Sequence, residues 1–234
     1  MEEKYIFDGH EATVIVPEKV AEGRPWVWRA EFLGDFDYVN RALLEKGWHI
    51  AYYKISDMFG CPEAVGLMKN FRDDVIKRYS LNAKADIFGF SRGGLYSANY
   101  TLKFPEDIST LYLDAPVLDI CSWPAGFGKG RGSQHDWEMC RRIYDLTDEN
   151  AGQFKGSPIY HLQELIDTKV PVLLVMGDSD KTVPYDENGL IMAREYEKQG
   201  AKIKVVIKKG VGHHPHSLEE PSELVSYIIS NRCF

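Results

Sequence analysis

Cysteine is scarce in this sequence, and its distribution excludes a fold that depends on disulfides. Only four cysteines occur among 234 residues, and no two of them form a C-x-x-C pair. Small disulfide-stabilised domains carry cysteine at a much higher density. We therefore expect Cys61, Cys121, Cys140 and Cys233 to be reduced residues that contribute to packing.

The sequence also has no long apolar run and no cluster of basic residues. The mean hydropathy is −0.32, and the chain has no run of about 20 apolar residues, which a membrane span requires. The chain has 28 basic and 35 acidic side chains, a net charge of −7, whereas nucleic-acid binding depends on clustered Lys and Arg. We expect a monomer or homodimer, with neither nucleic acid nor membrane as a partner.

The first ten residues, MEEKYIFDGH, lack the apolar core of a secretory signal peptide. Their acidic start also differs from the basic start of such a signal. We expect a cytoplasmic protein, or a secreted or periplasmic one from which a signal peptide has been removed.

Apolar segments of strand length alternate with helical patterns along the whole chain, without repeats or long linkers. This alternation is typical of an α/β fold. We expect a single domain over 1–234 that opens with an antiparallel hairpin and continues as a parallel sheet. The expected strands are 4–7, 12–16, 25–30, 48–53, 85–90, 110–115, 171–176 and 202–207. The expected helices are 35–46, 62–79, 92–104, 185–199 and 217–231.

One connection, 116–168, is far longer than a crossover between two strands requires. We expect it to be an inserted cap or lid. It contains a glycine-rich run, 126–132, that follows no strand and lacks the GK[ST] ending of a phosphate-binding loop. We expect this run to be a flexible loop.

The pentapeptide Gly-Phe-Ser-Arg-Gly at 89–93 lies between an expected strand and an expected helix. It fits G-x-S-x-G, the pattern of a nucleophile elbow. In such an elbow the serine has a strained backbone, and side chains at the glycine positions would collide with neighbouring atoms. The pattern alone is weak, but its position between strand and helix makes Ser91 a candidate nucleophile.

A serine nucleophile needs a histidine base and a carboxylate that orients the base, in the chain order Ser, acid, His. Asp178 and Asp180 follow the penultimate expected strand. The last expected strand is followed by His213, His214 and His216. Loops at the carboxyl ends of parallel strands share one edge of the sheet. The three histidines also permit a metal site, although their spacing is not that of an H-E-x-x-H zinc helix.

These segments resemble the α/β-hydrolase superfamily, and within it the catalytic domain of prolyl oligopeptidases and small acetylxylan-type esterases. The resemblance covers nearly the whole chain. Its motifs are GFSRGG at 89–94, G-x-x-D-x-x-V-P at 177–184, GVGH at 210–213 and Ser-Pro at 157–158. It implies an α/β-hydrolase fold, with a mostly parallel eight-stranded sheet, helices on both faces and a cap insertion. It also implies Asp180 as the acid and His213 as the base, with Asp178 and His214 as alternatives.

The resemblance further implies an oxyanion hole made of two main-chain N–H groups. One belongs to Arg92, which follows the nucleophile, and the other to a residue after the third strand. Such enzymes commonly carry His-Gly there, whereas this chain has Trp-Arg-Ala-Glu-Phe at 28–32. We place the second donor at Glu31, with Ala30 as the alternative.

Two residues are candidates for substrate binding. Arg29 lies beside the expected oxyanion hole, where it is a candidate for substrate selection or for a salt bridge with Glu31. Trp123 lies in the expected cap, where an aromatic ring can stack on a sugar.

The sequence therefore predicts a serine hydrolase that cleaves carboxylic esters through an acyl-enzyme, with carbohydrate esters as a candidate class and no metal or organic cofactor. Because 234 residues leave no room for the large extra domain of a complete prolyl oligopeptidase, an esterase is favoured over a small peptidase of that type. A metal-dependent hydrolase using His213, His214 and His216, and a non-catalytic binding protein of this fold, are the other hypotheses.

Overall fold

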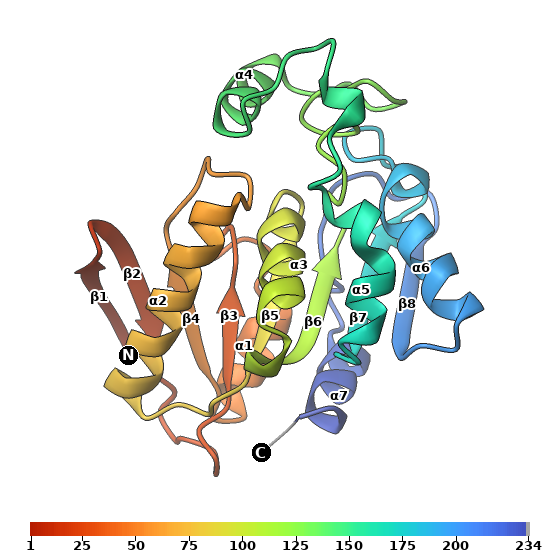
Figure 1. Ribbon diagram of the computed structural model, residues 1–234. Coiled ribbons are helices and arrows are strands. Elements are labelled where there is room, and N and C mark those ends of the chain that lie inside the picture. The colour runs from red at the N-terminus through yellow and green to blue at the C-terminus, as the bar shows by residue number, and fades with distance from the viewer. Residues whose placement is uncertain (233–234) are drawn as a thin grey trace.

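The computed structural model describes residues 1–232, which form one eight-stranded sheet in the order β1-β2-β4-β3-β5-β6-β7-β8 (Figure 1). The strands are β1 Glu2–Phe7, β2 His10–Ile15, β3 Trp26–Arg29, β4 His49–Tyr53, β5 Ala85–Phe90, β6 Ile108–Asp114, β7 Val172–Gly177 and β8 Ile203–Lys208. β2 pairs antiparallel with β1 and with β4, and every other pair is parallel. This arrangement confirms the α/β-hydrolase fold.

The helices are α1 Tyr38–Glu45, α2 Pro62–Tyr79, α3 Gly93–Lys103, α4 Gln134–Ile143, α5 Leu162–Asp167, α6 Gly189–Lys198 and α7 Ser222–Ser230. The five expected helices are present, with differences at their starts, and two further helices, α4 and α5, lie in the segment expected to be a cap. α2 matches its prediction, with Pro62 at its first turn. α1 begins later than expected because Phe36 has a φ of +48°, in the left-handed region that no right-handed helix contains. A separate 3₁₀ turn, η4 Tyr185–Glu187, replaces the expected first turn of α6.

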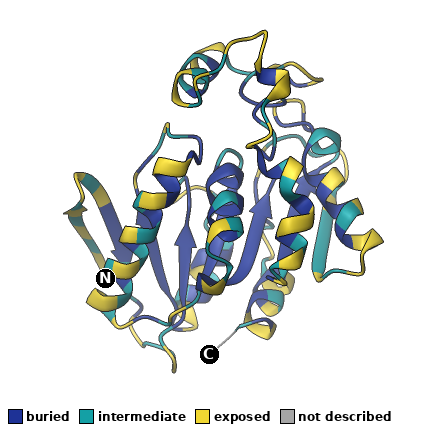
Figure 2. Ribbon diagram, viewed as in Figure 1, coloured by how far each residue is buried: buried dark blue, intermediate teal, exposed yellow. Residues whose placement is uncertain are grey.

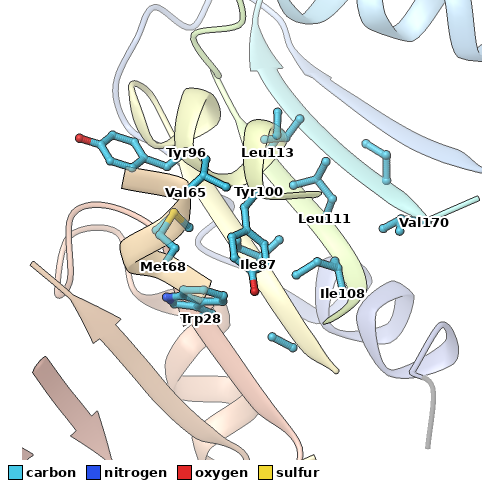
Figure 3. Packing of buried hydrophobic residues seen from close by; sticks show 14 of the residues in the cluster. Trp28, Val65, Met68, Ile87, Tyr96, Tyr100, Ile108, Leu111, Leu113 and Val170 are labelled. Carbon is cyan, nitrogen blue, oxygen red and sulfur yellow. The ribbon is translucent and has the colours of Figure 1, made fainter. Parts of the chain in front are cut away.

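Helices cover both faces of the sheet, with α2, α3, α5 and α6 on one face and α1 and α7 on the other (Figure 1). On the first face Met68 and Tyr100 pack with Trp28 and Ile87 of the central strands (Figure 3). Figure 2 shows that these central strands are buried along their length. Burial on both faces explains why they are continuously apolar in sequence rather than alternating.

The segment between β6 and β7 lies partly beyond the carboxyl ends of the parallel strands, where Figure 1 shows α4. Trp123 and Trp137 pack there around Phe59 in a separate hydrophobic cluster. The expected cap at 116–168 nevertheless extends too far, because α5 belongs to the core cluster of the sheet. A helix of six residues is too short to show a helical period in the sequence.

The glycine-rich run 126–132, which we expected to be a flexible loop, packs against the loop after β7. The main-chain N–H of Arg131 donates to the carbonyl of Lys181 at 3.3 Å. The main-chain N–H of Lys129 donates to the carboxylate of Glu187 at 2.5 Å. That carboxylate occupies the position at which an anion would bind, so the run does not serve as a phosphate cradle.

Cys61, Cys121 and Cys140 are free thiols, as expected. Burial raises the pKa of Cys121 to about 11, so this thiol is protonated at neutral pH. Cys233 lies outside the described residues. Across residues 1–232, no helix has the length and apolar character that a membrane span requires.

Two helical glycines provide a matched test of the packing around the nucleophile turn. A Cβ on Gly94 in α3 would lie 2.7 Å from the Cβ of Pro116 and 2.7 Å from the carbonyl oxygen of Val117, whereas a Cβ on Gly66 in α2 would meet nothing within 4 Å. We expect Gly94→Ala to lower the free energy of unfolding by about 1–3 kcal/mol. Gly66→Ala is expected to raise it by about 0.5–1 kcal/mol. Urea unfolding measures both, and equal effects of the two substitutions would contradict the packing described here.

Candidate active site

Ser91 occupies the sharp turn between β5 and α3. Its φ of +50° is rare for a residue with a side chain and marks a strained backbone. The N–H of Ser91 donates to the carbonyl of Asp114 at 3.0 Å, and its own carbonyl accepts from Val117 at 2.9 Å. A Cβ on Gly89 would lie 2.6 Å from the carbonyl oxygen of Gly93, so the turn requires glycine at position 89.

A continuous chain of hydrogen bonds joins Ser91, His213 and Asp180. The Nε2 atom of His213 lies 2.9 Å from Ser91 Oγ, and its Nδ1 atom lies 2.7 Å from Asp180 Oδ2. The other carboxylate oxygen of Asp180 accepts the N–H groups of Thr182 and Val183, at 2.8 and 2.9 Å. The carboxylate favours a proton on Nδ1, which leaves Nε2 free to accept the serine hydroxyl proton.

Asp178 has a different role from Asp180. Its Oδ1 atom accepts the N–H of Gly210 at 2.7 Å, which ties the loop after β7 to the loop after β8. A Cβ on Gly177 would lie 2.3 Å from the carbonyl oxygen of Val211, so the two loops touch at their backbones. The structure therefore places Asp180, and not Asp178, against the imidazole.

His214 stacks on Phe36, with ring centroids 5.4 Å apart and planes 17° apart. Across the described residues it makes no hydrogen bond to Ser91. Burial, followed by the neighbouring imidazoles of His216 and His213, lowers the pKa of His214. Of the two adjacent histidines, only His213 contacts the nucleophile.

His216 forms a second histidine–carboxylate pair beside the first. Its Nδ1 atom lies 2.8 Å from Oδ1 of Asp114, the buried last residue of β6. The other oxygen of Asp114 accepts the N–H of Ser217 at 2.7 Å and the hydroxyl of Tyr112 at 3.2 Å. No sequence signal identified Asp114, because it ends an apolar strand and follows no motif.

The N–H of Ala30 donates to the carbonyl of Phe88 at 3.0 Å, so the suggestion of Ala30 as an oxyanion donor is wrong. Within residues 1–232 the N–H groups of Glu31, Phe32 and Arg92 have no hydrogen-bond acceptor in the chain. Phe32 has a φ of +60° and lines the cavity beside the nucleophile. Sequence reasoning missed Phe32 because no motif marks it.

The Glu31 side chain is buried, with 2% of its surface exposed, and it pairs with Arg92 rather than with Arg29. Its Oε2 atom lies 3.0 Å from Arg92 Nε. The same guanidinium lies 2.8 Å from a carboxylate oxygen of Asp57 and 3.5 Å from one of Asp136 in α4. Arg92 thus joins the nucleophile turn to the loop after β3 and to α4.

Neither residue expected to bind substrate is available to do so. Arg29 is fully buried, with its guanidinium 3.9 Å from the ring centroid of Phe90 and donating to the carbonyl of Phe32 at 2.8 Å. Burial lowers the pKa of Arg29 to about 10, so it still carries its charge at neutral pH. Trp123 packs against Phe59 in the hydrophobic cluster under α4. Both suggestions are therefore wrong.

A cavity of about 300 Å³ opens beside the nucleophile. Its wall combines aromatic rings, imidazoles and one carboxylate, contributed by Phe32, Asp35, Phe36, Phe90, Ser91, His213, His214 and His216. The sequence did not reveal the phenylalanine wall, because Phe36 was assigned to a helix and Phe90 to the strand core.

The prolyl oligopeptidase family matches residues 73–227, a range that contains all three members of the hydrogen-bonded chain. The acylamino-acid-releasing enzyme of Rattus norvegicus is 25% identical over 144 residues, a match that covers 58% of this chain and 18% of that enzyme. The match therefore spans less than a fifth of that relative's length.

Solved structures share the fold at low identity. Dipeptidyl peptidase 4 of Porphyromonas gingivalis superposes with a TM-score of 0.69 and 14% identity, over 95% of this chain and 34% of that one. A CIB-like hydrolase from Thermoplasma acidophilum superposes with a TM-score of 0.58 and 16% identity, over 98% and 96% of the two chains. These identities show a common fold and no more than that.

The buried ion pair beside the nucleophile leads to a stability prediction. We expect Glu31→Gln to lower the free energy of unfolding by about 2–3 kcal/mol, because it removes a buried charge that faces Arg92. The matched control is Arg41→Ala, which breaks the exposed pair with Asp37 and is expected to have no measurable effect. Urea unfolding distinguishes the two, and a neutral Glu31→Gln would show that the pair does not stabilise the turn.

Proposed function

The chain belongs to the prolyl oligopeptidase family, and from that premise we propose that Ser91, His213 and Asp180 are the catalytic triad of a serine hydrolase. The observation that carries the proposal is the unbroken hydrogen-bonded chain, with distances of 2.9 Å and 2.7 Å about one imidazole. The strained turn that holds Ser91 supports it further.

In the proposed reaction Ser91 Oγ attacks the carbonyl carbon of the substrate while His213 Nε2 accepts the hydroxyl proton. Asp180 accepts the hydrogen bond from Nδ1 and stabilises the imidazolium that forms. His213 then donates the proton to the leaving group, and an acyl-enzyme remains. A water molecule, deprotonated by the same imidazole, releases the acid and restores the serine.

We place the oxyanion hole at the N–H groups of Arg92 and Phe32. Both lie next to the nucleophile and are free of acceptors within the described part of the chain. The left-handed backbone at Phe32 is the strained geometry that active sites often keep. Glu31, the donor expected from the sequence, becomes the alternative, because its N–H is also without an acceptor in the described part of the chain but it does not line the cavity that Phe32 and Ser91 share.

Carboxylic esters are the substrate class that we propose. The cavity of about 300 Å³ suits a short acyl group, and an alkoxide leaves a tetrahedral intermediate more readily than an amide anion does. Since Trp123 is buried, the proposal gives carbohydrate esters no preference over other esters. The names of an acylamino-acid-releasing enzyme and a dipeptidyl peptidase among the relatives favour a small peptidase as the second candidate.

The adjacent histidines provide a matched pair for testing the triad. We expect Ser91→Ala and His213→Ala to lower kcat by about 10⁴-fold or more, because each removes a member of one catalytic unit. His214→Ala is expected to change kcat by less than about tenfold. Steady-state hydrolysis of p-nitrophenyl acetate measures all three variants. A His214→Ala effect as large as that of His213→Ala would contradict the assigned base.

Two substrates with the same acyl group separate the esterase from the peptidase. N-acetyl-alanine methyl ester and N-acetyl-alanyl-alanine differ only in the leaving group. We expect turnover of the ester and no detectable cleavage of the dipeptide, measured by chromatographic detection of N-acetyl-alanine. Cleavage of the dipeptide that is lost in Ser91→Ala would establish the peptidase and overturn the proposed esterase.

A further inference from the structure

Three imidazoles form a nearly symmetrical cluster at the wall of the cavity. The ring centroids of His213, His214 and His216 lie 4.9 Å apart in each of the three pairs, with planes at 71°, 79° and 82°. One ligating atom from each ring lies within 4.8 Å of the others. The proposed reaction uses only His213, so it does not account for this convergence.

The spacing agrees with three imidazoles bound to one zinc ion. With Zn–N distances of about 2.0 Å and tetrahedral angles, the centroids of bound rings lie about 5 Å apart. In such a complex the ligating nitrogens are about 3.4 Å from one another. In the structure the ligating atoms are up to 4.8 Å apart. Rotation of the side chains can bring these atoms closer together, because the ring centroids already have the required separation.

Each of the three rings is oriented by a contact with the surrounding protein. His213 and His216 direct Nδ1 to the carboxylates of Asp180 and Asp114, at 2.7 and 2.8 Å. Metal-bound imidazoles characteristically have such a carboxylate on the remote nitrogen, since it fixes the tautomer whose Nε2 binds the metal. The ring of His214 is held by stacking on an aromatic side chain. All three rings line the same cavity, which leaves room for water as a fourth ligand.

We propose that His213, His214 and His216 bind a zinc ion, and that zinc bound there inhibits the hydrolase reversibly. Coordination uses the lone pair of His213 Nε2, the same pair that accepts the hydroxyl proton of Ser91. The ion therefore displaces one hydrogen bond and breaks no covalent bond. Zinc binding rests on the histidine geometry alone, whereas the inhibition also rests on the proposed function.

Cobalt(II), which absorbs visible light strongly in tetrahedral sites, measures the binding without any need for activity. We expect Ser91→Ala, which removes the competing hydroxyl, to bind one equivalent with a tetrahedral spectrum. His214→Gln or His216→Gln in that background should weaken binding at least tenfold. The matched control is His135→Gln, an exposed histidine at the start of α4, which should leave binding unchanged.

Two binding results would overturn the proposed zinc site. One is the absence of saturable binding of a single equivalent. The other is an equal loss of affinity in the His135 variant. Thermal unfolding in EDTA checks that each variant is folded. Because His214 is exposed, its substitution should disturb folding least among the three histidines.

Zinc titration of ester hydrolysis by the unsubstituted chain tests the inhibition. We expect zinc to inhibit hydrolysis and EDTA to restore it. The zinc concentration that gives half-inhibition should be at least tenfold higher in His214→Gln. The rate of each variant is compared with its own rate in the absence of zinc. Zinc-dependent activation of EDTA-treated protein would overturn both the inhibition and the proposed triad mechanism. If no ester is hydrolysed, the proposed function fails, and cobalt binding still decides the metal site.

Discussion

Close backbone packing among the loops at the carboxyl edge of the sheet is the constraint on which the geometry of the proposed triad depends. The loops after β7 and β8 touch where Gly177 faces the carbonyl of Val211, and this contact sets Asp180 against His213. The nucleophile turn is fixed separately, by the hydrogen bond from Ser91 to the end of β6. Ser91, Asp180 and His213 follow β5, β7 and β8 and are positioned by main-chain contacts. Main-chain atoms move less than side chains do, so these contacts hold the geometry well.

The segment beyond the strand ends is connected to the same loops. Arg92 reaches Asp136 of α4 from the residue next to the nucleophile. The glycine-rich run 126–132 donates main-chain hydrogen bonds to Lys181 and Glu187, in the loop that carries the proposed acid. Movement of this segment would therefore disturb the turn of Ser91 and the loop that holds Asp180. The segment thus supports the site as well as covering it.

The parts of the fold and site that the sequence predicted are those marked by local constraints. The central strands are apolar because both faces are buried, and each lies within two residues of its expected range. Ser91 was identifiable because the elbow demands glycine at position 89, where any side chain would meet the backbone of Gly93. The assignments of His213, after a glycine loop, and of Asp180, before Val-Pro, came instead from the resemblance of these motifs to the α/β-hydrolase superfamily.

The features that the sequence did not predict depend on contacts between distant residues. Asp114 pairs with His216, 102 residues away, and in the sequence it is only the polar end of a strand. Arg29 looks like an exposed charge, yet it is buried over Phe90. Phe36 has the spacing of a helical residue, but its left-handed backbone and its stacking on an imidazole are tertiary effects. Helical periodicity describes one element at a time and carries no such information.

Covalent labelling by a fluorophosphonate, located by mass spectrometry, tests whether Ser91 is an activated nucleophile. We expect one phosphonyl group per chain, attached to Ser91. Labelling should be slowed by orders of magnitude in Asp180→Asn and His213→Gln, which disrupt the activating imidazole. Labelling at another residue, or labelling of Ser91 at an unchanged rate in both variants, would contradict the proposed triad.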